Sequence, residues 1–160
     1  VTRRKRGVIK DVASLRSPHP WDFDNSQAQL VSSDGKNRIL YGELMEVGMG
    51  APLSASCFWV DSDGVEHHID DWCGGPPIWN SEGTKAAIPA WTRSWMRTVQ
   101  QIIVLDIEKK EALRYAPEFR VLDLRSFDGH HIYGYDSPVY KTQTLDFDLS
   151  KEKVIAAKDL

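Results

Sequence analysis

The sequence predicts an all-β protein made of antiparallel strands. Two observations support this fold class: apolar and polar residues alternate in short runs, and acidic-Gly pairs stand between those runs. The pairs are Asp34-Gly35, Asp63-Gly64, Glu82-Gly83 and Asp128-Gly129. Glycine and aspartate tolerate the positive φ that tight hairpin turns require, so each pair predicts a hairpin.

The runs between these turns give the predicted strands in chain order. They are Gln29–Ser32, Arg38–Val47, Ser54–Asp61, Glu66–Asp71, Pro77–Asn80, Lys85–Trp91, Gln100–Ile107, Ala112–Tyr115, Arg120–Arg125, His130–Tyr135 and Thr142–Asp148. Helix signals are confined to the two ends of the chain. A short helix is predicted over Val8–Leu15, and another over Leu149–Leu160 with Ser150 as its N-cap.

The strands fall into three approximate repeats. Each contains an acidic-Gly turn, a strand, a linker and a second strand that ends in aspartate; these final residues are Asp61, Asp106 and Asp148. The chain is therefore divided into an N-terminal arm, 1–25, and repeats 26–75, 76–118 and 119–160 of a single β-rich domain. Strand-end aspartates are typical of turns, where the carboxylate accepts local backbone hydrogen bonds.

The middle repeat, "PPIWNSEGTKAAIPAW…QQIIVLDIEKKEALRY", resembles a β-propeller blade of the WD-repeat or TolB-like kind. The resemblance implies a meander of antiparallel strands and carries no chemistry. A propeller typically needs four or more blades to close, and about three units fit here. We favour a curved or sandwiched sheet in one small domain; a propeller fragment, or one completed by oligomerisation, and a β-trefoil-like barrel are the alternatives.

Composition restricts the classes of partner. With 41% hydrophobic and 27% charged residues the chain is typical of a folded globular protein, and its net charge of −3 does not favour nucleic acid. The basic run Thr2–Gly7 is typical of a solvated tail. No apolar run is long enough for a membrane helix, and the segment after the basic start, "VIKDVASLRSP", carries charges where a signal peptide would be apolar, so we expect a cytoplasmic protein that does not bind membranes. Cys57 and Cys73 are expected to be buried apolar groups.

Two histidine pairs, in "EHHIDDWC" and "DGHHIYGYD", raise the question of a metal site. A two-residue turn at Asp63-Gly64 would pair Val60 with His67 and Trp59 with His68. Consecutive strand residues point to opposite faces, so His67 and His68 cannot ligate one ion together. His68 and Asp70 are spaced to share a face, but no third ligand is evident, and we expect no metal or other cofactor.

The second pair, His130 and His131, is expected to divide in the same way. His131 would share a core face with Leu122, Leu124, Tyr133 and Tyr135, and His130 would point away from it. The strand-associated carboxylates Asp61, Asp70, Asp71, Asp106 and Asp123 also admit a glycosidase-like interpretation.

The segment Pro89–Gln101, "PAWTRSWMRTVQQ", is predicted to be a long connection that binds a partner. It combines apolar and basic residues without an acidic one; the predicted binding residues are Trp91, Arg93, Trp95, Met96 and Arg97. Tryptophan and arginine are enriched at binding hot spots. A second interpretation remains open, in which both tryptophans fold back into the core.

These patterns favour a protein that binds another protein without catalysis. An acidic, compact chain without a catalytic motif fits the profile of bacterial immunity proteins, which neutralise a toxin by occluding it. The alternative is a metal-dependent or carboxylate-based hydrolase with its site at the end of a sheet, built from His67, His68, Asp70 and His130 or His131. The sequence leaves homo-oligomerisation open.

Overall fold

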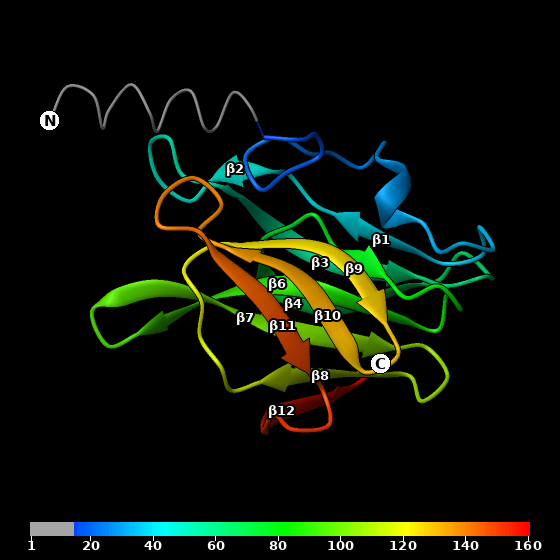
Figure 1. The fold of residues 1–160 in the computed structure, drawn as a ribbon. Helices are drawn as coiled ribbons and strands as arrows, with labels where there is room; N and C mark the ends of the chain where they lie inside the picture. Colours follow the sequence, from blue (N-terminus) through cyan, green and yellow to red (C-terminus); the bar gives the residue numbers. More distant parts are fainter. Residues whose placement is uncertain (1–14) are drawn as a thin grey trace, which may run out of the picture.

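A computed structural model describes residues 15–160 and confirms the all-β prediction. Two open antiparallel sheets are formed, one of nine strands and one of three (Figure 1). The elements are η1 (Ala28–Leu30), β1 (Arg38–Tyr41), β2 (Met45–Glu46), β3 (Leu53–Val60), β4 (Glu66–Cys73), β5 (Ile78–Trp79), β6 (Lys85–Ser94), β7 (Arg97–Asp106), β8 (Glu111–Tyr115), β9 (Leu122–Asp128), β10 (His131–Asp136), β11 (Gln143–Asp148) and β12 (Val154–Asp159).

The larger sheet is a meander in the order β1-β3-β4-β6-β7-β8-β12, with β2 added beside β3 and β5 beside β6. The smaller sheet has the order β11-β10-β9 and lies across the larger one, in yellow and orange in Figure 1. Most neighbouring strands are close in sequence, as expected when hairpin turns connect them; the exception is β12, which pairs with β8. The resemblance of these meanders to propeller blades remains a prediction.

Apolar side chains form two cores, one on each face of the larger sheet. The first core gathers residues from β1, β3, β4, β6, β7 and β8, including Ile39, Trp59 and Leu105. The second lies between the two sheets, where Ile102 and Val104 pack with residues of β9, β10 and β11. Strands β6 and β7 are covered on both faces, which explains their nearly continuous buried runs.

The predicted turns are present. Gly35, Gly64, Gly83 and Gly129 have φ values of 74°, 81°, 70° and 58°. The three strand-end aspartates have the local role that the repeats predict. One carboxylate oxygen of Asp61 accepts from the backbone of Asp63 and Val65, that of Asp106 from Glu108 and Lys109, and that of Asp148 from Ser150.

The end of the chain differs from the prediction. Residues predicted to form a C-terminal helix instead form β12, which pairs with β8 at the edge of the larger sheet. The edge of β8 pairs with this segment through a ladder that is interrupted by one bulge, and that tertiary pairing overrides its helix propensity. The predicted helix over Val8–Leu15 lies almost wholly outside the described residues.

Two predicted strands near the beginning are also altered. Gln29–Ser32 overlaps the 3-10 turn η1, and of its residues only Val31 makes an isolated bridge, to Arg38. Arg38–Val47 is interrupted between β1 and β2, where Gly42 donates to the carbonyl of Ser56. Within residues 15–160, no helix has the length and apolar character needed to cross a bilayer.

Candidate functional site: the tip of the β6–β7 hairpin

The predicted binding segment Pro89–Gln101 is a hairpin, not a long connection. Strands β6 and β7 run ten residues each and remain paired up to Ser94 and Arg97, so Trp95 and Met96 alone form the turn. The prediction of a loop was wrong because threonine, valine and tryptophan favour an extended ladder over a loop. The hairpin projects beyond the body of the sheets, at the left of Figure 1.

The structure separates the two tryptophans of this segment. Trp91 is 5% exposed, and its ring stacks with that of Trp72 at a centroid distance of 6.2 Å. Trp95 and Met96 are 96% and 85% exposed, and Arg93 and Arg97 are exposed beside them. Trp91 is therefore buried, as in the interpretation that the tryptophans fold back into the core, whereas Trp95 is exposed, as in the interpretation that the segment binds a partner. We name Arg93, Trp95, Met96 and Arg97 the hairpin-tip surface.

The backbone of the turn is unusual for its residue type. Trp95 has φ of 56°, in the left-handed region that glycine, asparagine and aspartate tolerate best. A bulky residue at such a position stores strain on the order of 1 kcal/mol. Because the Trp95 side chain is almost fully exposed, burial within the chain does not offset this cost.

A groove lies at the base of the hairpin. It has a volume of about 590 Å³ and is lined by apolar groups and two arginines: Val47, Ala51, Trp91, Arg97, Thr98, Val99, Arg120 and Val121. The loop between β2 and β3 supplies Val47 and Ala51, and the same loop carries Met49, which is fully exposed. The indole Nε1 of Trp91 is buried and has no hydrogen-bond partner among the described residues.

The charge at this end of the molecule contrasts with that of the whole chain. Arg93, Arg97 and Arg120 form no ion pair with any residue in the described part, although the net charge of the protein is −3. Among residues 15–160, the one acidic group bonded to the turn region is Glu118, whose carboxylate accepts from Ser94 Oγ at 2.9 Å. The hairpin tip and groove therefore present apolar area with uncompensated positive charge.

The first histidine pair follows a different register from the predicted one. Asp61 pairs with Val65 around a three-residue loop, so Trp59 lies opposite His67 and Phe58 opposite His68. His67 stacks on Trp59 and bonds to Asp61 at 2.8 Å. The predicted register was wrong by one residue because the turn is longer than two residues.

The two weak candidates for metal ligation are engaged elsewhere. His68 bonds through Nε2 to Asp71 at 2.7 Å, and its Nδ1 accepts from Lys158 Nζ at 2.7 Å. Asp70 bonds to Arg114 at 3.2 Å and to the backbone N–H of Trp72. In the stretch from residue 15 to the C-terminus, no three His, Cys, Asp or Glu side chains are placed to hold a metal ion.

The second histidine pair also departs from the predicted faces. His131 pairs with Asp128, and Ile132 is the buried residue of β10, whereas Tyr133 and Tyr135 are 40% and 42% exposed. The turn between β9 and β10 consists of Gly129 and His130. A bulge in β9 then shifts the pairing with β10 after Tyr133. His131 bonds to Asp146 at 2.8 Å, and this hydrogen bond raises the pKa of the imidazole above 6.5.

Sequence reasoning missed the residues that come to the hairpin from distant segments. Arg120 lies in the connection from β8 to β9, and no local pattern distinguishes it. Met49 had a signal: a methionine between two glycines is a large apolar residue on a loop that cannot bury it. No family model, curated protein or solved structure matches the chain, so the assignment of function depends on this geometry.

Proposed function

We propose that this chain is a non-catalytic protein-binding module whose hairpin-tip surface contacts the partner. The observation that carries the proposal is Trp95: a fully exposed tryptophan at a backbone position suited to glycine. A residue that costs folding energy and gains no burial within its own chain is expected to serve an intermolecular contact.

The surroundings of Trp95 support the same function. Aromatic, methionine and arginine side chains are the types enriched in the centre of protein interfaces, and here all three occur together. The groove beside the hairpin offers room for a partner side chain, and Arg97 and Arg120 favour an acidic one. The composition of the chain favours the profile of an immunity protein, so the narrower form of the proposal is that the partner is a bacterial toxin, neutralised by occlusion in the cytoplasm.

The hydrolase alternative has less support from the geometry. His67 and His68 bond to different aspartates, Asp61 and Asp71, and Asp70 bonds to Arg114. The histidines of the second pair lie on the other sheet or its turn. Among residues 15–160, these side chains do not gather into one cluster that could act on a single substrate atom.

The test compares two baits that differ at one residue. Wild-type protein and Trp95→Gly are used in parallel for affinity capture from cells of the source organism, and the captured protein is then purified and titrated by calorimetry. Loss of a hot-spot tryptophan weakens an interface by about 30-fold or more. A partner that binds both baits with equal affinity would refute the proposed surface.

The toxin form of the proposal has its own test. The captured protein is expressed alone and together with this chain in a host that lacks both. A toxin partner arrests growth when alone and is harmless in the presence of wild-type chain, and Trp95→Gly restores much of the arrest. Harmless expression of the partner alone excludes the toxin class while leaving the protein-binding function in place.

A further inference from the structure

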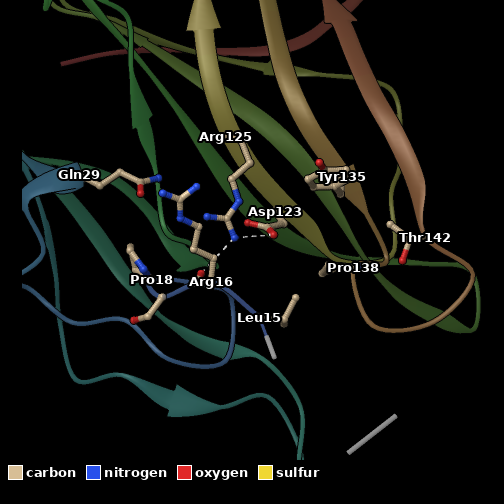
Figure 2. Close-up of a pocket in the computed structure, with 10 residues that line it drawn as sticks. Leu15, Arg16, Pro18, Gln29, Asp123, Arg125, Tyr135, Pro138 and Thr142 are labelled. Carbon is tan, nitrogen blue, oxygen red and sulfur yellow. Dashed lines mark hydrogen bonds and ion pairs between the residues drawn. The ribbon is translucent and has the colours of Figure 1, made fainter. Parts of the chain in front are cut away.

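A second cavity lies on the side of the molecule where the three-stranded sheet meets the first described residues. It has a volume of about 700 Å³, within the range of small-molecule sites. Arg16 and Gln29 line one side, Asp123 and Arg125 of β9 line another, and Tyr135 of β10 completes the wall (Figure 2). This cavity shares no lining residue with the groove at the hairpin.

A β-bulge builds the acidic wall of this cavity. Tyr133 pairs with Ser126 and Gly134 with Leu124, so Arg125 is the extra residue of β9, and Tyr135 then lies opposite Asp123. At Gly134 the strands approach so closely that a Cβ atom would lie 2.1 Å from the carbonyl oxygen of Asp123. Bulges of this kind are common beside functional sites, where they redirect side chains.

Asp123 is incompletely satisfied. Its side chain is 2% exposed; Oδ2 accepts from Arg125 Nη2 at 2.8 Å, and Oδ1 has no partner among residues 15–160. Burial raises the pKa of this carboxyl group. An unpaired oxygen on a buried carboxylate costs on the order of 1–3 kcal/mol, so a donor that reaches it would be stabilising.

Arg16 and Arg125 restrict the charge that a ligand carrying this donor can have. Arg16 forms no ion pair within the described part of the chain; its backbone carbonyl accepts from Arg125 Nη2 at 3.3 Å, and both arginines line the cavity. Two guanidinium groups in one cavity repel a simple cation, whereas the unpaired oxygen of Asp123 repels a simple anion. A molecule with both a cationic nitrogen and an anionic oxygen satisfies both groups.

We propose that this cavity binds a small zwitterion of the amino-acid or short-peptide class, with its ammonium group on Asp123 and its carboxylate on Arg16. Asp123 Oδ1 is covered in this structure, so the proposal requires that the cavity wall move enough to expose it to the ammonium group. The flanking apolar residues Leu15, Pro18 and Pro138 receive the side chain of the ligand.

Matched probes test this proposal. The full chain is titrated by NMR with L-phenylalanine, with phenethylamine, which lacks the carboxylate, and with 3-phenylpropanoate, which lacks the amine. We expect L-phenylalanine to bind about tenfold more tightly than either probe, because each charged hydrogen bond contributes about that factor or more. The signals that move should include those of Asp123 and Tyr135.

Variants locate the site. Asp123→Asn and Arg16→Gln should each weaken L-phenylalanine binding by about tenfold, while Asp128→Asn, at the exposed end of β9, and Trp95→Gly should leave it unchanged. Equal binding of the amine or the acid, an unchanged affinity of Asp123→Asn, or no binding of L-phenylalanine up to about 10 mM would each overturn the proposal. Because Trp95→Gly is the control, failure here leaves the hairpin function untouched.

Discussion

Replacement of Trp95 by glycine is expected to make the protein more stable while weakening the binding of the proposed partner. In the folded state Trp95 holds φ at 56°, which costs a non-glycine residue about 1–2 kcal/mol. Glycine removes this cost but loses more backbone entropy on folding, about 0.5–1 kcal/mol. The relief of backbone strain is larger than the added entropy cost, so the glycine variant is expected to have the higher free energy of unfolding.

The lost side chain changes this balance little. Trp95 is 96% exposed. A tryptophan buries up to about 250 Å², so the covered part is about 10 Å² and contributes about 0.25 kcal/mol. The net expectation for Trp95→Gly is a gain of about 0.5 kcal/mol in the free energy of unfolding. For a chain of this size this gain raises Tm by about 1–2 °C.

Thermal and urea unfolding of three variants would measure this effect. Trp95→Gly and Trp95→Asn both relieve the backbone, because asparagine also tolerates positive φ, and both should be at least as stable as wild type. Trp95→Ala keeps the strain and should leave Tm within about 1 °C of wild type. A loss of more than about 1 kcal/mol in Trp95→Gly would show that the indole packs within its own chain, and the reasoning that assigns it to a partner would fail.

Three further outcomes are expected. Gly134→Ala forces a Cβ against the Asp123 carbonyl and should lower the free energy of unfolding by about 3 kcal/mol, whereas Gly48→Ala, with open space around it, should change it by less than about 0.5 kcal/mol in urea titrations. Burial raises the pKa of the Asp123 carboxyl group. The contribution of this group to the free energy of unfolding is therefore most favourable below pH 3.8 and is lost as the pH rises through the folded-state pKa. Asp123→Asn should therefore have a higher Tm than the wild-type protein at pH 7 and lose that difference near pH 3. A Tm below that of the wild type at pH 7 would contradict this expectation. The hydrogen bond that His131 Nδ1 donates to the Asp146 carboxylate raises the pKa of His131, so their contact stabilises the fold fully below pH 6.5 and weakens as the pH rises through the folded-state value. NMR titration of the His131 ring should give a pKa above 6.5 that falls in Asp146→Asn, and an unchanged pKa in the variant argues against the contact.

The fold could be predicted from sequence where local chemistry decides it. Acidic-Gly pairs set the turns, and alternation set the strands between them, because both signals act over a few residues. Register was less predictable. One extra residue in the loop after Asp61, and one in β9 at Arg125, moved side chains away from their predicted partners or faces. Loop length and bulges depend on the twist and packing of the whole sheet, and a single sequence does not display them.

Long-range pairing explains the remaining differences. The C-terminal segment has residues that favour a helix, yet it completes the edge of β8, and nothing near it in sequence indicates that this edge is unpaired. The same reason hides Arg120 from the sequence: it meets the groove through a connection between strands of different sheets. By contrast, Trp95 and Met96 were predicted as binding residues from composition alone, and the structure places both in the exposed turn.

Trp95 and Asp123 share a physical property that links the two proposed sites. Each carries a local cost, positive φ in one case and an unpaired buried oxygen in the other, whereas the strand-end aspartates of the fold accept local backbone hydrogen bonds. Random drift in a stable protein could leave one such cost anywhere. Trp95 lies beside a groove lined by Arg97 and Arg120, and Asp123 lines a cavity with Arg16; none of these three arginines forms an ion pair in the described chain. A local cost beside unpaired charge and open volume is what a binding site carries before its ligand arrives.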